Sequence, residues 1–157
     1  MARAHGATVT LAVGVEEARE EVWRLTDGNG ADVVYDVTGA AAVLPFALPL
    51  LRRFGRLLLL GDTGAPAAQR LTPDVVVRGL QIVGAHDNNP PPVSTDYAHW
   101  SHEQMVRLFY TFLRRGDMRV SDLVTHRYSP RDAAEAYRML REQRASAMGV
   151  ILDWTQV

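Results

Sequence analysis

The hydrophobic positions of this chain alternate between short apolar runs and longer amphipathic stretches. The apolar runs are rich in valine, isoleucine or leucine and end at glycine, aspartate or asparagine, which is typical of buried strands. The amphipathic stretches place their apolar side chains on one face at helical spacing. Strands that alternate with single helices predict an α/β protein in which the strands pair in parallel.

The pattern predicts strands over residues 8–13, 32–37, 56–60, 80–85, 123–128 and 149–154. It predicts helices over residues 16–26, 41–53, 72–79, 101–115 and 129–144. The segment 86–100 contains three consecutive prolines and is expected to be a loop. Ligands of parallel sheets bind at the carboxyl ends of the strands, which draws attention to the turns after residues 37, 60 and 85.

The composition narrows the function classes. The chain has 157 residues, 47% of them hydrophobic and 22% charged, which suits one soluble domain over 1–157. A net charge of −1 gives no general attraction to nucleic acid or to an anionic membrane. No run is long and apolar enough to span a bilayer, and the first residues lack a signal-peptide core. We therefore expect a cytoplasmic protein with no nucleic-acid or membrane partner.

Two groups of side chains could bind a ligand, a metal ion in one case and a phosphate in the other. His99 and His102, with Asp96 and Glu103 nearby, could form a metal site, but a solvated helix start is favoured and no metal site is predicted. The chain has no cysteine, so a zinc site made of thiolates is excluded. Arg52, Arg53 and Arg56 would flank the end of helix 41–53, where cations suit the helix dipole, and a phosphate site there is the alternative.

Several segments resemble, in order, the nucleotide-binding domain of the medium-chain dehydrogenase/reductase family, in particular its zinc-type alcohol dehydrogenases. Residues 4–7 resemble the approach to the family's third strand, and residues 25–39 the stretch before and along its fourth strand. The following elements are matched by residues 47–61, 80–85, 132–137 and 149–152. The resemblance implies a partial Rossmann-like, doubly wound parallel sheet followed by C-terminal helix and strand elements. The family's first βαβ unit, with its Gly-rich phosphate loop, and its zinc-bearing N-terminal domain have no counterpart here. We therefore expect a fragment, an internal-start product or a truncated relative.

The resemblance also implies a cofactor, either NAD or NADP, whose binding is weak or lost in this chain. Thr38 and Gly39 would contact its adenosine or ribose side. Gly61, Asp62 and Thr63 would face the nicotinamide ribose and carboxamide, and Ala85 and His86 would lie beside the ring. The alternative is that these glycines only end strands. Buried Asp36 is expected to cap a neighbouring backbone group, and no catalytic residue can be assigned, although His86 is the nearest candidate.

Three functions follow from these observations. The first is the nicotinamide half of an oxidoreductase that acts on an alcohol/carbonyl pair, with a missing N-terminal catalytic chain as a partner. The second is a non-catalytic dimerisation or interaction module derived from that domain. The third is a repurposed pocket in the loop 87–100. The resemblance further implies a homodimer through the edge strand Leu80–Ala85.

Overall fold

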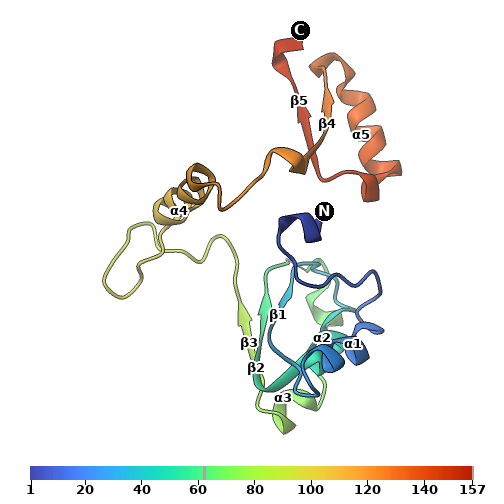
Figure 1. Cartoon of the computed structure of the whole chain (residues 1–157), viewed down its shortest axis with the longest axis vertical. Helices are drawn as coiled ribbons and strands as arrows, with labels where there is room; N and C mark the ends of the chain where they lie inside the picture. Colours follow the sequence, from blue (N-terminus) through green and yellow to red (C-terminus); the bar gives the residue numbers. More distant parts are fainter. Residues whose placement is uncertain (62, 157) are drawn as a thin grey trace. The chain divides into compact units, whose positions relative to one another are not determined.

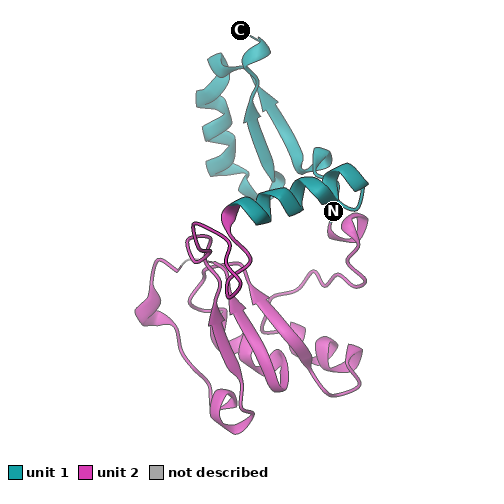
Figure 2. Cartoon of the chain, turned by 90° about the vertical axis from the view of Figure 1, so that its left-hand side faces the viewer, with its two compact units in different colours: residues 1, 103–157 teal, residues 2–102 magenta. Residues whose placement is uncertain are grey.

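The structure is a computed structural model of the whole chain, and it describes residues 1–61 and 63–156. The chain divides into two compact units (Figure 2). One unit is Ala2–His102, and the other is Glu103–Val157 together with Met1. Each unit has a parallel sheet of its own, and the expectation of a single domain over 1–157 stays a prediction.

The unit Ala2–His102 is built on a three-stranded sheet in the order β1-β2-β3 (Figure 1). Its elements are α1 (Ala18–Leu25), β1 (Ala31–Asp36), α2 (Leu44–Ala47), β2 (Leu51–Leu59), α3 (Asp74–Val77) and β3 (Gln81–Gly84). Short 3-10 helices cover Ala2–His5, Leu48–Leu50 and Pro66–Ala68. Both strand pairs are parallel, with Leu57 of β2 opposite Val34 on one side and Ile82 on the other. The α/β class and the parallel pairing are confirmed.

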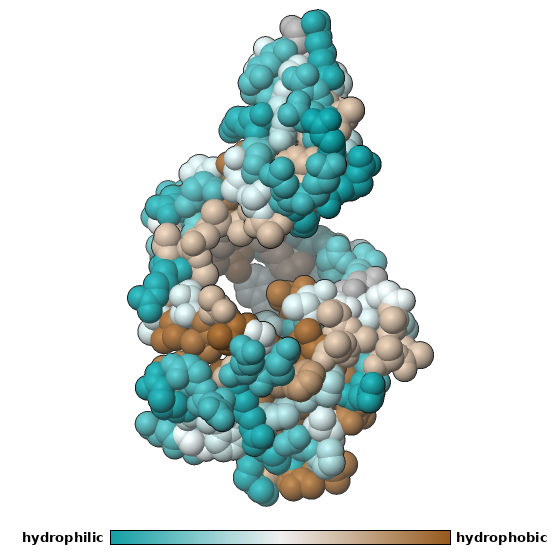
Figure 3. Space-filling model, turned by 90° about the vertical axis from the view of Figure 1, so that its right-hand side faces the viewer, coloured by the Kyte–Doolittle hydropathy of each residue, from teal (hydrophilic) through white to brown (hydrophobic). Residues whose placement is uncertain are grey.

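The core of this unit lies on one face of the sheet. Its buried side chains are Leu44 and Ala47 of α2, Leu48 of the 3-10 turn that follows, Leu51 and Leu57 of β2, and Leu80, which directly precedes β3. Val34, Leu59 and Ile82 of the three strands pack against this cluster. Because side chains alternate along a strand, Val33, Tyr35 and Val83 belong to the other face, where they are 40%, 62% and 39% exposed. Other large hydrophobic side chains are also exposed, and Figure 3 shows several such areas on the surface.

The predicted helix 41–53 is wrong in its second half. The α-helix covers only Leu44–Ala47, a 3-10 turn follows, and the chain is extended from Leu51 onward. Pro49 explains this ending, because proline has no amide hydrogen to donate and its ring clashes with the preceding helical turn. Arg52 and Arg53 therefore lie on β2 and not at the end of a helix.

The predicted strand 8–13 is also wrong. These residues have no regular structure, and Val9, Leu11 and Val13 are 40%, 39% and 51% exposed. A strand needs a neighbour to satisfy its backbone N–H and C=O groups, and none of β1, β2 and β3 pairs with this segment. An apolar, β-branched run is therefore not sufficient to form a strand here.

The second unit contains α4 (His102–Arg115), which starts at the boundary, β4 (Val124–Tyr128), α5 (Ala133–Glu142) and β5 (Gly149–Leu152). Its 3-10 turns are Ser121–Leu123, Pro130–Asp132, Arg144–Ser146 and Trp154–Gln156. β4 and β5 pair in parallel, as the helix between them requires. Among the described residues, no helix is long and apolar enough to cross a membrane.

Candidate functional site

The turns that follow β1, β2 and β3 lie side by side where the strands have their carboxyl ends, and this side of the sheet is called the carboxyl edge. The backbone amides of Leu60 and Gly61 donate to the carbonyl oxygen of Asp36 at 2.9 and 3.1 Å. The amide of Ala85 donates to the carbonyl oxygen of Leu59 at 2.9 Å. Parallel pairing therefore brings segments that are far apart in the sequence to a single edge, the one at which ligands of such sheets bind.

Asp36 organises the first of these turns. Its side chain is only 5% exposed, and its Oδ1 accepts hydrogen bonds from the Thr38 amide at 2.9 Å and the Thr38 hydroxyl at 2.7 Å. The Thr38 hydroxyl oxygen in turn accepts from the Ala40 amide at 3.1 Å. The expectation that Asp36 caps neighbouring backbone is confirmed, and the same bonds fix the position of Thr38.

The first and second turns touch at two glycines. A Cβ atom at Gly61 would lie 2.2 Å from the Gly39 nitrogen and 2.9 Å from its Cα, so only glycine fits there. Gly39 itself has a φ of 65°, in the left-handed region that favours glycine. The neighbouring turn thus explains why Gly61 is a glycine, and contact of either residue with a cofactor stays a prediction.

The other predicted site residues lie along the same edge, except Asp62, which is outside the described residues. The Thr63 hydroxyl accepts a hydrogen bond from the Ala65 amide at 3.3 Å. Ala85 and His86 follow β3 and are exposed. The Nδ1 atom of His86 lies 2.7 Å from a carboxylate oxygen of Asp87, so this ring is held by its own loop.

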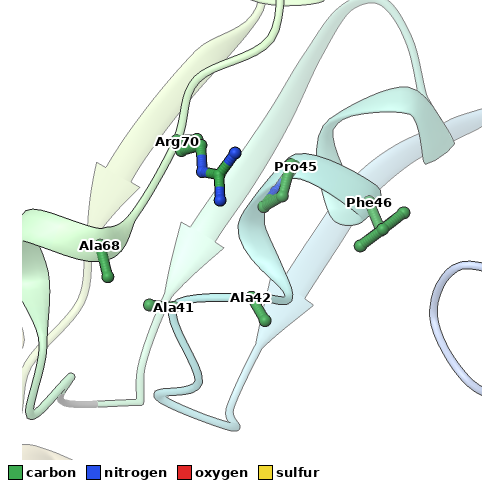
Figure 4. Close-up of a pocket in the computed structure, with 6 residues that line it drawn as sticks. All are labelled: Ala41, Ala42, Pro45, Phe46, Ala68 and Arg70. Atoms are coloured by element: carbon green, nitrogen blue, oxygen red, sulfur yellow. The ribbon is translucent and has the colours of Figure 1, made fainter.

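Two hollows border these turns. One, of about 570 Å³, runs along β1 and is lined by side chains that include Val13, Val37 and Thr38. The other, of about 550 Å³, lies between α2 and the segment 68–70, and Figure 4 shows the Arg70 side chain pointing into the space between Ala68 and Pro45. Both volumes fall within the range of small-molecule sites, about 300–1,000 Å³. The sequence pattern did not single out Arg70, because the alanines around it form no periodic or polar motif.

Metal-binding residues do not gather in the described part of the chain. No group of three or more histidine, aspartate or glutamate side chains there is placed to hold an ion. The ring of His99 packs edge-on against Trp100, with centroids 4.9 Å apart. The described residues therefore do not supply the three protein ligands that a catalytic zinc ion needs.

Residues 1–102 match the model of the family described as zinc-binding dehydrogenase. The chain belongs to this family. The resemblance seen in the sequence is confirmed, and with it the assignment to the nucleotide-binding half of a zinc-type alcohol dehydrogenase-like protein.

Similar proteins cover almost the whole chain. D-arabitol-phosphate dehydrogenase from Enterococcus avium is 25% identical over 142 residues, which is 90% of this chain and 37% of that protein. The alcohol dehydrogenase TADH from Thermus sp. ATN1 superposes with a TM-score of 0.75 at 22% identity, over 96% of this chain and 39% of the other. The alcohol dehydrogenase rspB from E. coli CFT073, solved with NADH, gives a TM-score of 0.70 at 16% identity, over 98% and 40%. This zinc-binding dehydrogenase chain thus spans about two fifths of the proteins it resembles.

Proposed function

We propose that this chain is the nicotinamide-binding part of an oxidoreductase that acts on an alcohol/carbonyl pair, and that it is incomplete on its own. The observation that carries the proposal is the meeting of the turns after β1, β2 and β3 at the carboxyl edge of a parallel sheet. Membership of the zinc-binding dehydrogenase family supports it, as does the NADH bound in rspB.

The residues at this edge fit one half of a dinucleotide. Gly39 has no side chain, so a ligand can approach its backbone closely. The absence of a side chain at Gly61 lets the first two turns meet. The Thr63 hydroxyl can donate to a ligand, whereas the Thr38 hydroxyl already donates to Asp36 and can only accept. Ala85 and His86 follow β3 at the same end of the sheet. A bound nicotinamide would supply hydride transfer, while this chain would bind and orient it. The Gly-rich turn that binds the pyrophosphate has no counterpart in this sequence, so we expect weak binding and leave NAD and NADP both open.

The remaining parts of the proposal concern partners. An alcohol or carbonyl substrate and a second, N-terminal catalytic chain would complete the enzyme, since no zinc site fits the described residues. β3 is one of the two edge strands of its sheet, and Gln81 and Val83 on it are exposed. We propose homodimerisation through this strand, because an unpaired edge favours pairing with another strand. A cytoplasmic location also stays a prediction.

A second function is favoured by the open face of the sheet. Val33 and Tyr35 lie on β1, and Val37 directly follows it. Their side chains are 40%, 62% and 67% exposed, respectively. An apolar face of this kind is typical of interaction surfaces. The alternative is therefore a non-catalytic dimerisation or interaction module built on the same fold.

The test is calorimetric titration of the purified chain with NADH and with NADPH, together with light scattering to measure its mass. Saturable binding in the micromolar to low millimolar range, weakened in His86→Ala but not in the control His102→Ala, would support the cofactor-binding function. A folded dimer that binds neither nucleotide would refute it and favour the interaction module.

A further inference from the structure

Another pocket lies at the opposite end of the same sheet, where β2 begins. Its volume is about 500 Å³, and it is lined by Trp23, Phe54, three arginines and the turn at Gly28 and Asn29. None of the lining residues is acidic. Because Gly39 and Gly61 follow the carboxyl ends of their strands, this pocket is separate from the candidate cofactor edge.

The wall of the pocket is a bulge in β2 with an unusual backbone. Leu51 pairs with Ala31 and Arg56 with Val33, so β2 carries extra residues between these two partners. Within the bulge, Phe54 has a φ of 59°, which is costly for a residue with a bulky side chain. The bulge is held over the end of α3, because the Phe54 amide donates to the carbonyl oxygen of Arg78 at 2.9 Å. The Phe54 ring is nevertheless 68% exposed.

The floor of the pocket is rigid. The Trp23 indole N–H donates to the Pro49 carbonyl oxygen at 3.0 Å. The Arg78 guanidinium lies over the Trp23 ring, 5.2 Å from its centroid, and donates to the carbonyl oxygens of Pro49 and Leu51. Its ion pair with Asp74, at 3.4 Å, completes this arrangement. Arg78 therefore links the elements around the pocket, and both of its terminal nitrogens already donate to protein groups.

The other two arginines keep donors for a ligand. Arg52 pairs through Nε with Asp32 and donates through Nη1 to the Arg53 carbonyl oxygen at 2.8 Å, which leaves its Nη2 group. The Arg53 guanidinium has no hydrogen bond or ion pair with any described residue. It lies 5.7 Å from the centroid of the Phe54 ring. A guanidinium without a protein partner beside an exposed aromatic side chain suits a ligand in which a phosphate is attached to an aromatic ring.

We propose that this pocket binds an aromatic phosphate monoester, with the phosphate on Arg53 and Arg52 and the ring against Phe54. Such a site goes beyond the proposed cofactor function and does not depend on it. Guanidinium forks bind phosphate oxygens in pairs, and an aromatic face adds stacking energy to an otherwise exposed contact. The bulge fixes the backbone from which the Arg53 and Phe54 side chains extend, so both start from the same strand segment.

Phenyl phosphate is the probe, and Trp23 is the reporter. Trp100 and Trp154 are 52% and 74% exposed, so Trp100→Phe and Trp154→Phe leave Trp23 as the single indole at little cost to stability. In this background we expect saturable quenching of Trp23 fluorescence by phenyl phosphate. Phenol, which lacks the phosphate, and inorganic phosphate, which lacks the ring, should each bind about tenfold more weakly.

Variants distinguish specific binding in this pocket from a general attraction of the anionic ligand to positively charged side chains. Arg53→Gln should weaken phenyl phosphate binding about tenfold, and Arg53→Lys should fall between it and the parent, because lysine keeps the charge but loses the fork. Arg3→Gln removes an exposed arginine of the same unit outside this pocket and should change nothing. Equal losses in Arg53→Gln and Arg3→Gln, or equal affinity for phenyl phosphate and inorganic phosphate, would overturn the proposal. The NADH affinity of Arg53→Gln should equal that of the parent. A negative result for phenyl phosphate therefore does not test the proposed cofactor function, and the two proposals can fail separately.

Discussion

Replacing Gly61 with alanine tests whether the contact between the first two turns is real. The added Cβ would meet the Gly39 nitrogen at 2.2 Å, whereas Cβ atoms in proteins essentially never approach closer than 3.0 Å. The two turns must therefore separate by at least about 0.8 Å, and both are backbone that cannot rotate away. Separation also stretches the bonds that Leu60 and Gly61 donate to Asp36.

The cost follows from these two effects. Overpacking of this kind costs about 1–3 kcal/mol, and one weakened backbone hydrogen bond adds about 1 kcal/mol. We expect Gly61→Ala to lower the free energy of unfolding by about 2–4 kcal/mol. With a urea dependence of about 2 kcal/mol per molar, the midpoint should fall by about 1–2 M.

The assay is urea unfolding followed by circular dichroism, and Gly64→Ala is the matched control. Gly64 lies in the same loop, but a Cβ there would meet nothing within 4 Å, so its effect should stay within about 0.5 kcal/mol. NADH affinity should fall in Gly61→Ala and persist in Gly64→Ala. Equal unfolding midpoints for the two variants would refute the close approach of the turns.

Three further predictions concern the core, the pH dependence and the second unit. Leu57→Ala removes a fully buried side chain and should cost about 2–5 kcal/mol in urea unfolding. The hydrogen bond from the Thr72 hydroxyl holds the pKa of Asp74 below its usual value, and the ion pair with a nearby arginine acts in the same direction. The stability that Asp74 contributes over Asp74→Asn should therefore be complete near neutral pH and disappear as the pH falls below about 4, because protonation of the folded state removes it. Gly149→Ala would bring a Cβ within 2.6 Å of the Leu123 carbonyl oxygen and should therefore shift β5 away from β4. Hydrogen exchange should then show less protection of the backbone amides that pair these two strands.

Local patterns predicted most of the elements correctly. The runs behind β1, β3 and β5 are apolar, bounded by turn residues and too short for a helix, so each pattern allowed one structure. The two errors have different causes. The alanines and leucines of 41–53 favour a helix, but Pro49 stops it, because proline disrupts the helical hydrogen bonds whatever its neighbours. In 8–13 the residues suit a strand, but strand formation also requires a partner, and a single segment carries no information about that.

The candidate site likewise has one part that local sequence patterns predicted and another that only tertiary contacts decided. Turn chemistry indicated Thr38, Gly39, Gly61 and His86 as residues that follow strands, because glycine and small polar residues end strands locally. It could not show that Gly61 packs on Gly39, nor that the Phe54 bulge leaves Arg53 free beside an aromatic face.

The sequence by itself determined the α/β class and most element positions, since side-chain periodicity and turn residues act over a few neighbours. The family followed from the resemblance of several segments, in order, to known dehydrogenases. Only the tertiary structure decided which turns touch, which arginines are already paired and which face of the sheet stays open. The contacts between the turns and the pair of Arg52 with Asp32 join residues about twenty or more positions apart, and their geometry depends on the register of β1, β2 and β3.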